Sequence, residues 1–479
     1  MTSAFLGIIG RTADITLVAF LLMQLALAFR VSQTVLLHLY HRRTGLERER
    51  IALTRPLPTD DKLPAVLVQI PTFNEGPLVQ RVLDAVVALD WPRDRLQIQL
   101  LDDSTDASAE IARATVADLH LRGYSVNLIQ RTHRAGFKAG ALKAGLACTR
   151  EPFVAVFDAD YVPQPNFLRL CLRPLLDDPH LAFVQARCDF LNARENRVTH
   201  AQQVILESHF AVEQPTRSWA GQFLPFNGTG GVWRRAAIEA AGGWQADTLT
   251  EDLDLSYRAQ MRGWRALYLV CVAVPGELPE SLASWGVQQC RWNKGFAQTT
   301  RKLLPTIWRS NLPLRRKFDA ALHLGGCAFG PLVLATGILC WIDILLGTFS
   351  YSLVLPLAAL GLLQGLTGAL AMALLSTHLL RQPGVGSQTR SFMTTCGLTF
   401  YTIMMHHYAA ALTARSVLDG IRGRASAFVR TPKRDRLPGG SGGAAGPSSR
   451  AEQSSQIADQ RSRSCRAIEP PSPPSREQR

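Results

Sequence analysis

The stretch FVAVFDAD (Phe153–Asp160) decides the fold class, because its run of apolar side chains is typical of a buried strand and ends in acidic residues. Four other stretches share this character: AVLVQIPTFNE (Ala65–Glu75), LQIQLLDDSTD (Leu96–Asp106), SVNLIQR (Ser125–Arg131) and LAFVQARC (Leu181–Cys188). Helical segments separate them. Strands that alternate with helices predict an α/β fold with a mostly parallel sheet, whose ligands bind beyond the carboxyl ends of the strands.

The composition favours a membrane protein over a nucleic-acid-binding protein. The 479 residues carry a formal net charge of +14, but the basic residues form no patch interleaved with aromatics, so we expect no nucleic acid partner. Many of them flank apolar stretches, as on the cytosolic side of a membrane protein in contact with lipids. The nine cysteines are scattered without CxxC pairs, which predicts reduced thiols and no disulfide framework.

An apolar segment near the N-terminus predicts a membrane anchor over residues 1–45. The segment Asp14–Tyr40 exceeds the roughly 20 residues that a spanning helix needs. Because Arg30 interrupts it, we place the membrane core at Ile15–Phe29 and extend the helix into the interface. No small-residue cleavage site follows, and the basic HRRTGLERER comes next, so we expect an uncleaved anchor whose C-terminal side is cytosolic. A cytosolic α/β domain is predicted over residues 46–275.

The second half of the chain returns to apolar segments. Residues 276–316 predict interface helices, with Trp285 and Trp308 in the headgroup layer, and residues 317–380 predict a hairpin of spanning helices in which Asp343 is solvated.

The region 381–433 is harder to place. A spanning helix over 391–414 would put the basic RGRASAFVRTPKR outside, so an interfacial or re-entrant helix is favoured and the spanning alternative stays open. Residues 434–479 are rich in Gly, Ser, Pro and Arg, which predicts a disordered tail.

The acids of FVAVFDAD suit a metal. In an extended chain residues i and i+2 point the same way, so Asp158 and Asp160 would present two carboxylates to one place. Carboxylates at a strand end are ligands for Mg²⁺ or Mn²⁺ that bridge phosphates. On these two residues alone, a solvated strand end that turns at Pro163 stays an alternative.

The other strand ends suit a nucleotide. Glu75, Asp102 and Asp103 follow the first two strands, and neither strand carries a glycine-rich phosphate loop, which speaks against a Rossmann dinucleotide site and a P-loop ATPase. Acids at these positions fit recognition of a base and a ribose. Arg134 and Lys138 supply cations that could approach a diphosphate, although a basic helix start is common on any surface.

The segment TEDLD (Thr250–Asp254) concentrates acids in one turn. Thr250 is a good N-cap, and Glu251 and Asp254 favour the positive end of a helix. The acids therefore either stabilise a helix terminus only, or Asp252 also takes a proton from a substrate.

Together these motifs resemble a known family. The order DD (Asp102–Asp103), DAD (Asp158–Asp160), TED (Thr250–Asp252) and QQCRW (Gln288–Trp292) is similar to that of the inverting, nucleotide-sugar-dependent family 2 glycosyltransferases of GT-A fold in the membrane-embedded cellulose synthase group. The wording of VQIPTFNE, GFKAGAL and FNGTGGVWRR looks more like the mannan and glucomannan synthase branch. FVRTPKR resembles the gating-loop motif of cellulose synthases.

The resemblance implies a role for each matching position. It implies that Asp252 is the general base and that Asp158 and Asp160 hold Mg²⁺ or Mn²⁺. The residues implied to bind the nucleotide sugar are Thr72, Glu75, Asp102, Asp103, Lys138 and Arg291. Those implied to bind the acceptor are Asn227, Gly228, Glu251, Gln288, Gln289 and Trp292, and those of the gating loop are Phe428, Thr431 and Lys433.

The function expected from these features is a processive transferase that makes a β-linked polysaccharide at the cytosolic membrane face from GDP-mannose or UDP-glucose. The alternatives are a non-processive transferase that makes a glycolipid on a lipid acceptor and a non-catalytic scaffold that binds nucleotide sugars. So few spans would carry a growing β-glycan only if chains associate as a homo-oligomer or recruit accessory export subunits. The arginine-rich and alanine-rich composition indicates a bacterial inner membrane.

Overall fold

A seven-stranded sheet lies at the centre of a computed structural model of the chain, which describes residues 2–347, 349, 351–382, 385, 392–424 and 430–431. The strand order is β3-β2-β1-β4-β6-β5-β7. The strands are β1 (Val66–Thr72), β2 (Leu96–Asp102), β3 (Val126–Gln130), β4 (Phe153–Val156), β5 (Leu181–Phe190), β6 (Gly231–Arg234) and β7 (Arg265–Gly276). Neighbouring strands run parallel except at β6, which is antiparallel to β4 and β5. The prediction of a mostly parallel sheet is confirmed.

The register of the parallel strands brings their polar ends to one edge. Thr72 at the end of β1 pairs with Asp102 at the end of β2, and Asp102 pairs with Gln130 at the end of β3. The five strands predicted from sequence are β1 to β5, each within or close to its expected stretch. β6 and β7 complete the sheet on the side of β4.

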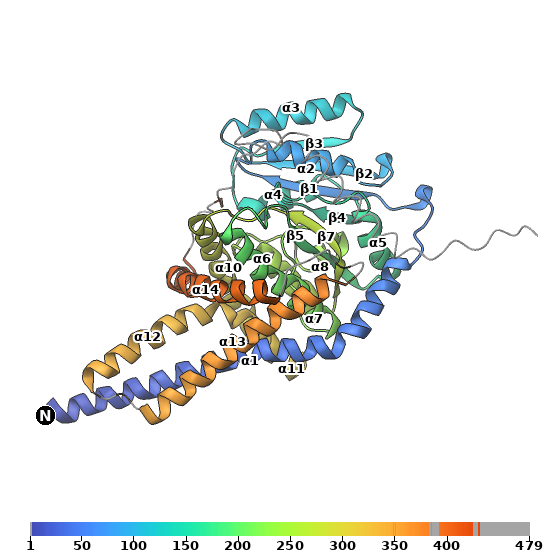
Figure 1. The fold of residues 1–479 in the computed structure, drawn as a ribbon. Helices are drawn as coiled ribbons and strands as arrows, with labels where there is room; N and C mark the ends of the chain where they lie inside the picture. The colour runs from blue at the N-terminus through green and yellow to red at the C-terminus, as the bar shows by residue number, and fades with distance from the viewer. Residues whose placement is uncertain are drawn as a thin grey trace, which may run out of the picture.

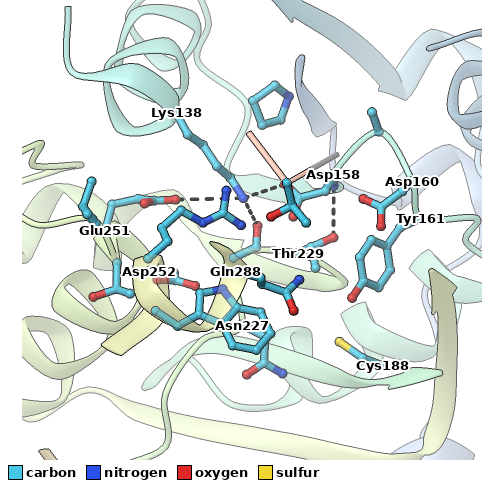
Figure 2. Close-up of a pocket in the computed structure, with 18 of the residues that line it drawn as sticks. Lys138, Asp158, Asp160, Tyr161, Cys188, Asn227, Thr229, Glu251, Asp252 and Gln288 are labelled. Carbon is cyan, nitrogen blue, oxygen red and sulfur yellow. Dashed lines mark hydrogen bonds and ion pairs between the residues drawn. The ribbon is translucent and has the colours of Figure 1, made fainter. Parts of the chain in front are cut away.

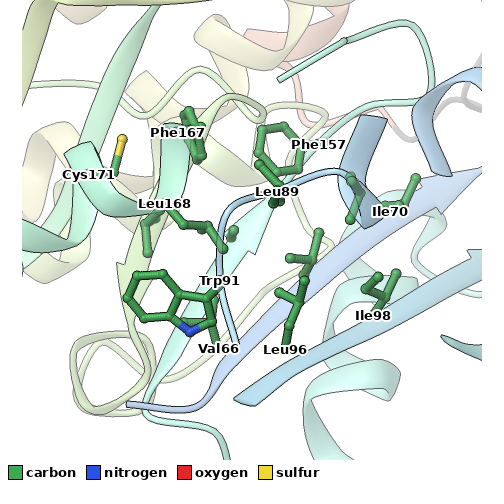
Figure 3. Close-up of a cluster of buried hydrophobic side chains, with 14 of the residues drawn as sticks. Val66, Ile70, Leu89, Trp91, Leu96, Ile98, Phe157, Phe167, Leu168 and Cys171 are labelled. Carbon is green, nitrogen blue, oxygen red and sulfur yellow. The ribbon is translucent and has the colours of Figure 1, made fainter. Parts of the chain in front are cut away.

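Alternating side chains of β1 supply two apolar cores, one on each face of the sheet. Val66 and Ile70 belong to one cluster, and Leu67 belongs to the other. In the first cluster Phe157 and Phe167 meet edge to face with ring centroids 5.0 Å apart, and Trp91 closes the far end (Figure 3). Burial of such side chains, at about 25 cal/mol per Å² of apolar area, holds the strands and helices together.

Helices connect and cover the strands (Figure 1). Those of the sheet domain and the segment after it are α2 (Leu78–Val87), α3 (Ser108–Leu121), α4 (Phe137–Ala147), α5 (Phe167–Asp177), α6 (Arg197–Glu207), η3 (Ser208–Glu213), α7 (Gln214–Trp219), α8 (Arg235–Ala240), α9 (Glu251–Met261) and α10 (Leu282–Arg309). Two short 3₁₀ turns are η1 (Asp60–Lys62) and η2 (Arg93–Arg95). α6, η3 and α7 follow one another without a break, and η3 is a π-helical turn.

Within the described residues, three helical segments are long and apolar enough to cross a membrane: Thr12–Thr54, Leu314–Leu346 and Tyr351–Leu380. They comprise α1 (Thr2–Thr54), the run α11 (Leu314–Leu324), η4 (Gly325–Ala328) and α12 (Phe329–Leu346), and α13 (Tyr351–Leu380). α1, α12 and α13 project together from one side of the sheet domain (Figure 1). These helices indicate a membrane protein. α14 (Phe392–Ile421) packs against α10 and is not among the candidate spans.

The C-terminal half of α1 is fixed to the sheet domain. Arg30 pairs with Glu213 at 2.6 Å, and the Trp219 indole N–H donates to Glu49 Oε1 at 2.9 Å. Gly45 lies so close to Trp219 that an added Cβ would clash with the indole. The helix therefore continues through Arg30, as the sequence predicts, and its second half packs firmly against the sheet domain.

Two interpretations of single residues were wrong. Trp285 does not face lipid headgroups; it is 3% exposed and packs with Ala201, Met405 and Ala409 between α6, α10 and α14. Asp343 is not solvated, since it is fully buried near the end of α12. Phe428, Lys433 and the tail 434–479 lie outside the residues that the structure describes.

Candidate active site

A cavity of about 310 Å³ opens at the carboxyl ends of the strands, where the sequence predicts a site (Figure 2). Fourteen of the predicted site residues line it: Thr72, Glu75, Asp103, Lys138, Asp158, Asp160, Asn227, Gly228, Glu251, Asp252, Gln288, Arg291, Trp292 and Thr431. Residues from four of the sequence motifs and from the C-terminal loop thus converge on one place. Asp102 and Gln289 are not among the lining residues.

Lys138 is the central cation of the cavity. Its Nζ lies 2.6 Å from Asp158 Oδ1, donates to the Gly228 carbonyl at 2.9 Å and lies 3.9 Å from Glu251 Oε1 (Figure 2). Burial alone would lower the pKa of this ammonium, but Asp158 and Glu251 hold the pKa above its ordinary value. Lys138 is therefore a fixed positive charge, suited to meet an anionic group.

The DAD motif lies in a turn and not in an extended strand. β4 ends at Val156, and the Tyr161 N–H donates to the Asp158 carbonyl at 3.0 Å. The expected i, i+2 geometry of a strand is therefore wrong, yet both carboxylates line the cavity. Asp160 Oδ2 accepts the Glu277 N–H at 3.3 Å, which fixes one of its oxygens.

The two carboxylates fit a divalent cation that phosphate oxygens help to bind. Asp158 already holds a cation, the Lys138 ammonium, at 2.6 Å. Among the described residues, no group of three or more His, Cys, Asp or Glu side chains could hold a metal ion by itself. Mg²⁺ and Mn²⁺ in nucleotide enzymes commonly use one or two carboxylates together with substrate phosphates, and this donor set matches that pattern.

Asp252 stands in the first turn of α9, beside Glu251. Thr250 occupies the N-cap position, but its side chain makes no capping hydrogen bond and instead pairs with Thr299 Oγ1 at 3.1 Å, so the predicted side-chain cap is wrong. Asp254 is fully buried and pairs with Arg258 at 2.7 Å. Of the three acids, Asp254 is structural, whereas Glu251 and Asp252 line the cavity.

The surroundings of Asp252 suit a base. Burial, and next the neighbouring Glu251 charge, raise the pKa of Asp252 to about 7, and burial also raises the pKa of Glu251. Gly228 approaches closely from the opposite wall: it has φ +75°, and an added Cβ would lie 2.8 Å from Asp252 Oδ2. A carboxyl with a pKa near 7 is well matched to proton transfer at neutral pH.

The QQCRW segment lies on α10 and presents one face to the cavity. Gln288, Arg291 and Trp292 have the i, i+3, i+4 spacing that places side chains on one face of a helix, and all three line the cavity. Gln289 does not follow this spacing, and its side chain is not among those that line the cavity. Burial lowers the pKa of the Arg291 guanidinium, and the cluster of acids offsets part of this effect.

At the other end of the cavity, acids are held by polar and basic partners. Asp102 is 2% exposed, and its carboxylate accepts from Thr72 Oγ1 at 3.1 Å and from Gln130 Nε2 at 3.0 Å, below the cavity wall. Asp103 Oδ1 accepts from Arg131 Nε at 2.9 Å. Glu75 Oε2 accepts from Arg430 Nη2 at 2.9 Å.

Several lining residues were not singled out from the sequence: Phe73, Tyr161, Cys188, His209, Phe210, Glu277 and Arg430. Tyr161 directly follows DAD, and Arg430 lies within FVRTPKR, so adjacency to a motif could have found both. His209 and Phe210 carry no such signal, because the π-helical turn η3 that presents them is not visible in the sequence pattern.

Comparison with known proteins gives consistent matches. Residues 64–295 match the glycosyltransferase like family 2. The chain is 40% identical over 309 residues to glucomannan 4-beta-mannosyltransferase 1 of Oryza sativa subsp. japonica, covering 60% of this chain and 59% of the rice protein. It is 42% identical over 264 residues to glucomannan 4-beta-mannosyltransferase 2 of Arabidopsis thaliana, covering 53% of this chain and 49% of that protein. The chain thus spans about half to three fifths of these relatives' length.

Among solved structures, a mannosyltransferase from Pyrobaculum calidifontis in complex with GDP-Man and Mn²⁺ is similar with a TM-score of 0.52 and 24% identity. The match covers 83% of this chain and 99% of that one. At this identity the likeness shows the fold, which is that of a GT-A glycosyltransferase.

Proposed function

We propose that the whole chain, whose residues 64–295 match the glycosyltransferase like family 2, is an inverting glycosyltransferase that extends a β-linked mannan- or glucomannan-type polysaccharide from a nucleotide sugar. The observation that carries this proposal is the geometry of one cavity around Gly228. A Cβ added at Gly228 would lie 2.8 Å from Asp252 Oδ2 and 3.1 Å from Lys138 Nζ. The proposed base, Asp252, and the proposed diphosphate-binding cation, Lys138, therefore both lie next to Gly228 in the cavity.

In the proposed reaction, the Asp252 carboxylate takes the proton of an acceptor hydroxyl as the oxygen attacks the anomeric carbon of the donor sugar. Attack from the face opposite the leaving group turns an α-linked donor into a β-glycoside. Lys138 and Arg291 balance the negative charge on the departing nucleoside diphosphate. A divalent cation held by Asp158 and Asp160 would supply Lewis-acid stabilisation of the same group.

In this proposal the donor nucleotide and the acceptor sugar bind at different ends of the cavity. Phe73, Asp103 and Glu75 lie at the end that would take the nucleoside, where aromatic and acidic groups suit a base and a ribose. Gln288 and Trp292 would take the acceptor, with the indole against a sugar ring. The naming of the plant relatives as glucomannan 4-beta-mannosyltransferases favours GDP-mannose over UDP-glucose as the donor.

The candidate spans support a polymerase that works at a membrane. We propose a multi-pass protein of a bacterial inner membrane, with residues 46–275 cytosolic and α14 lying in the interface. The three candidate spans found in the described part of the chain supply little wall for a translocation path, so export of the polymer would require association of chains or accessory subunits.

The test uses the full chain in nanodiscs with Mn²⁺ and radiolabelled GDP-mannose or UDP-glucose, offered separately. We expect ethanol-insoluble polymer from one donor, and a loss of about 10²- to 10⁴-fold in rate in Asp252→Asn. Label found only in the lipid-extractable fraction would make the protein a glycolipid synthase. Donor binding without transfer by the wild type would make it a nucleotide-sugar-binding scaffold.

A further inference from the structure

A chain of buried and partly buried polar side chains leads from the cavity to α1, the first candidate span. Arg30 Nη1 of α1 lies 2.6 Å from Glu213 Oε1, and Glu213 Oε2 lies 3.0 Å from His209 Nδ1. His209 Nε2 lies 3.0 Å from Gln214 Nε2, which lies 2.5 Å from Asn227 Oδ1. We name Arg30, Glu213, His209 and Gln214 the relay, and Asn227 its end.

The Glu213 carboxylate fixes the direction of the hydrogen bonds made to it. The Glu213 carboxylate only accepts, so His209 Nδ1 carries a proton and donates to it. The Gln214 amide lies 3.0 Å from His209 Nε2, and Gln214 Nε2 donates to Asn227 Oδ1. The Asn227 carboxamide is therefore held through its Oδ1.

A π-helical turn makes this arrangement possible. η3 (Ser208–Glu213) interrupts the helical run from α6 to α7 with a wider turn. This turn presents His209 and Phe210 to the cavity, while Glu213 faces α1. Single π-helical turns inside helices are frequent at functional sites, which makes η3 a place to look for a functional role.

The relay is mostly buried and pairs a cation with a carboxylate, as a positioning element requires. Gln214 is fully buried, and the side chains of Arg30, Glu213 and His209 are 20%, 13% and 32% exposed. A buried ion pair is expensive to assemble and contributes little net stability, so stability alone is a weak reason for its presence. The ion pair and the hydrogen bonds do, in contrast, hold the relay side chains in fixed positions.

At the cavity, the relay determines what Asn227 offers a sugar. Because Oδ1 is occupied by Gln214, the group that remains is the Nδ2 amide, which is buried in the cavity wall and interacts with the Cys188 thiol. The backbone of Asn227 is also held in place, since its N–H donates to Gln185 Oε1 at 3.0 Å. A fixed N–H donor recognises a hydroxyl oxygen of a sugar.

We propose that the relay is a positioning device that fixes the Asn227 amide as a hydrogen-bond donor to the acceptor sugar and ties this contact to α1. This inference rests on the proposed function, because it names residues that set acceptor recognition for that reaction. Gln214, Glu213, His209 and Arg30 act through Asn227 and touch no reacting atom.

The test is a double-mutant cycle on Gln214→Met and Asn227→Ala in the full chain in nanodiscs. We expect each single variant to raise KM for a β-manno-oligosaccharide acceptor about tenfold, with donor KM and kcat within about twofold of wild type. The double variant should be no worse than Asn227→Ala alone, because both changes remove the same contact. Gln202→Met is the matched control: Gln202 is also buried on this helical run, but donates to the Pro279 carbonyl at 2.7 Å, and its acceptor KM should stay unchanged.

Glu213→Gln provides a second route if Gln214→Met fails to fold, since it keeps the shape of the side chain and removes the charge that holds Arg30 and His209. The same selective rise in acceptor KM is expected. Losses that multiply in the double variant, or an equal rise in donor KM, would overturn the relay while leaving the transferase intact. A wild-type chain that transfers no sugar would overturn the proposed function and the relay with it.

Discussion

Arg430 and Glu75 lie 355 residues apart in the chain, yet Arg430 Nη2 donates to Glu75 Oε2 at 2.9 Å. Glu75 follows β1, and Arg430 belongs to the FVRTPKR segment near the end of the described chain. The pair is partly buried, with side chains 24% and 19% exposed. It brings the C-terminal segment, through Arg430 and Thr431, onto the wall of the cavity at the end proposed for the nucleoside.

Breaking this pair should weaken donor binding. In Arg430→Gln we expect donor KM to rise about fivefold, which corresponds to about 1 kcal/mol, with acceptor KM unchanged. Steady-state kinetics with varied donor would measure it. Arg424→Gln is the control, because Arg424 pairs with Asp419 at 3.1 Å on the surface. A donor KM equal to wild type would mean that the segment does not contribute to the donor site.

Gly228 should tolerate no side chain. At φ +75° an L-residue costs about 1 kcal/mol, and the new Cβ would lie 2.8 Å from Asp252 Oδ2 and push the base aside. We expect Gly228→Ala to lower kcat by at least about 100-fold while the melting temperature falls only slightly. Gly243→Ala separates the two effects, because Gly243 has φ +73° with no atom within 4 Å of the added Cβ. If both variants lose activity equally, backbone strain and not displacement of Asp252 is the cause.

The pKa of Asp252 predicts the pH dependence of turnover. A base must be deprotonated to act, and the pKa of Asp252 is raised to about 7, so kcat/KM should fall about tenfold per pH unit below pH 7. Removing the Glu251 charge in Glu251→Gln lowers the pKa of Asp252, and the acidic limb should therefore move to lower pH. Glu239→Gln, an exposed acid on α8, should leave the limb in place. A limb that does not move in Glu251→Gln would contradict the pairing of these two carboxyls.

Much of the site could be predicted because its residues stand at strand ends or helix starts that the sequence pattern reveals. The parallel register that joins Thr72 to Asp102 follows from the buried strands, so acids distant in sequence had to converge. A local rule, the preference of threonine for capping a helix with its side chain, gave a wrong prediction at this site. Thr250 was expected to cap α9 with its side chain, but Thr299 competes for its hydroxyl, and this contact depends on how α10 packs.

What sequence could not predict depends on tertiary contacts. Asp102 and Asp103 are adjacent and chemically alike, yet the alternation of side chains along β2 buries the first and leaves the second at the cavity. His209 reaches the cavity only through the π-helical turn η3, which has no sequence signature. Trp285 was interpreted from composition as a membrane-interface residue, but α14 covers it.

The distance between Lys138 and Asp158 leads to a prediction about the metal. With its ammonium 2.6 Å from Asp158 Oδ1, Lys138 presents a like charge to any cation that approaches that carboxylate. A nucleoside diphosphate would attract Lys138 and add oxygen ligands, so Mn²⁺ affinity should rise at least about tenfold when GDP or UDP is added. Electron paramagnetic resonance titration of free Mn²⁺ would measure both affinities. Asp160→Asn should weaken binding in the presence of the nucleotide, whereas Asp94→Asn, which alters an exposed acid, should not. Removal of the metal with a chelator should abolish turnover, and added Mn²⁺ should restore it. An equal Mn²⁺ affinity with and without nucleotide would show that Lys138 does not control metal binding.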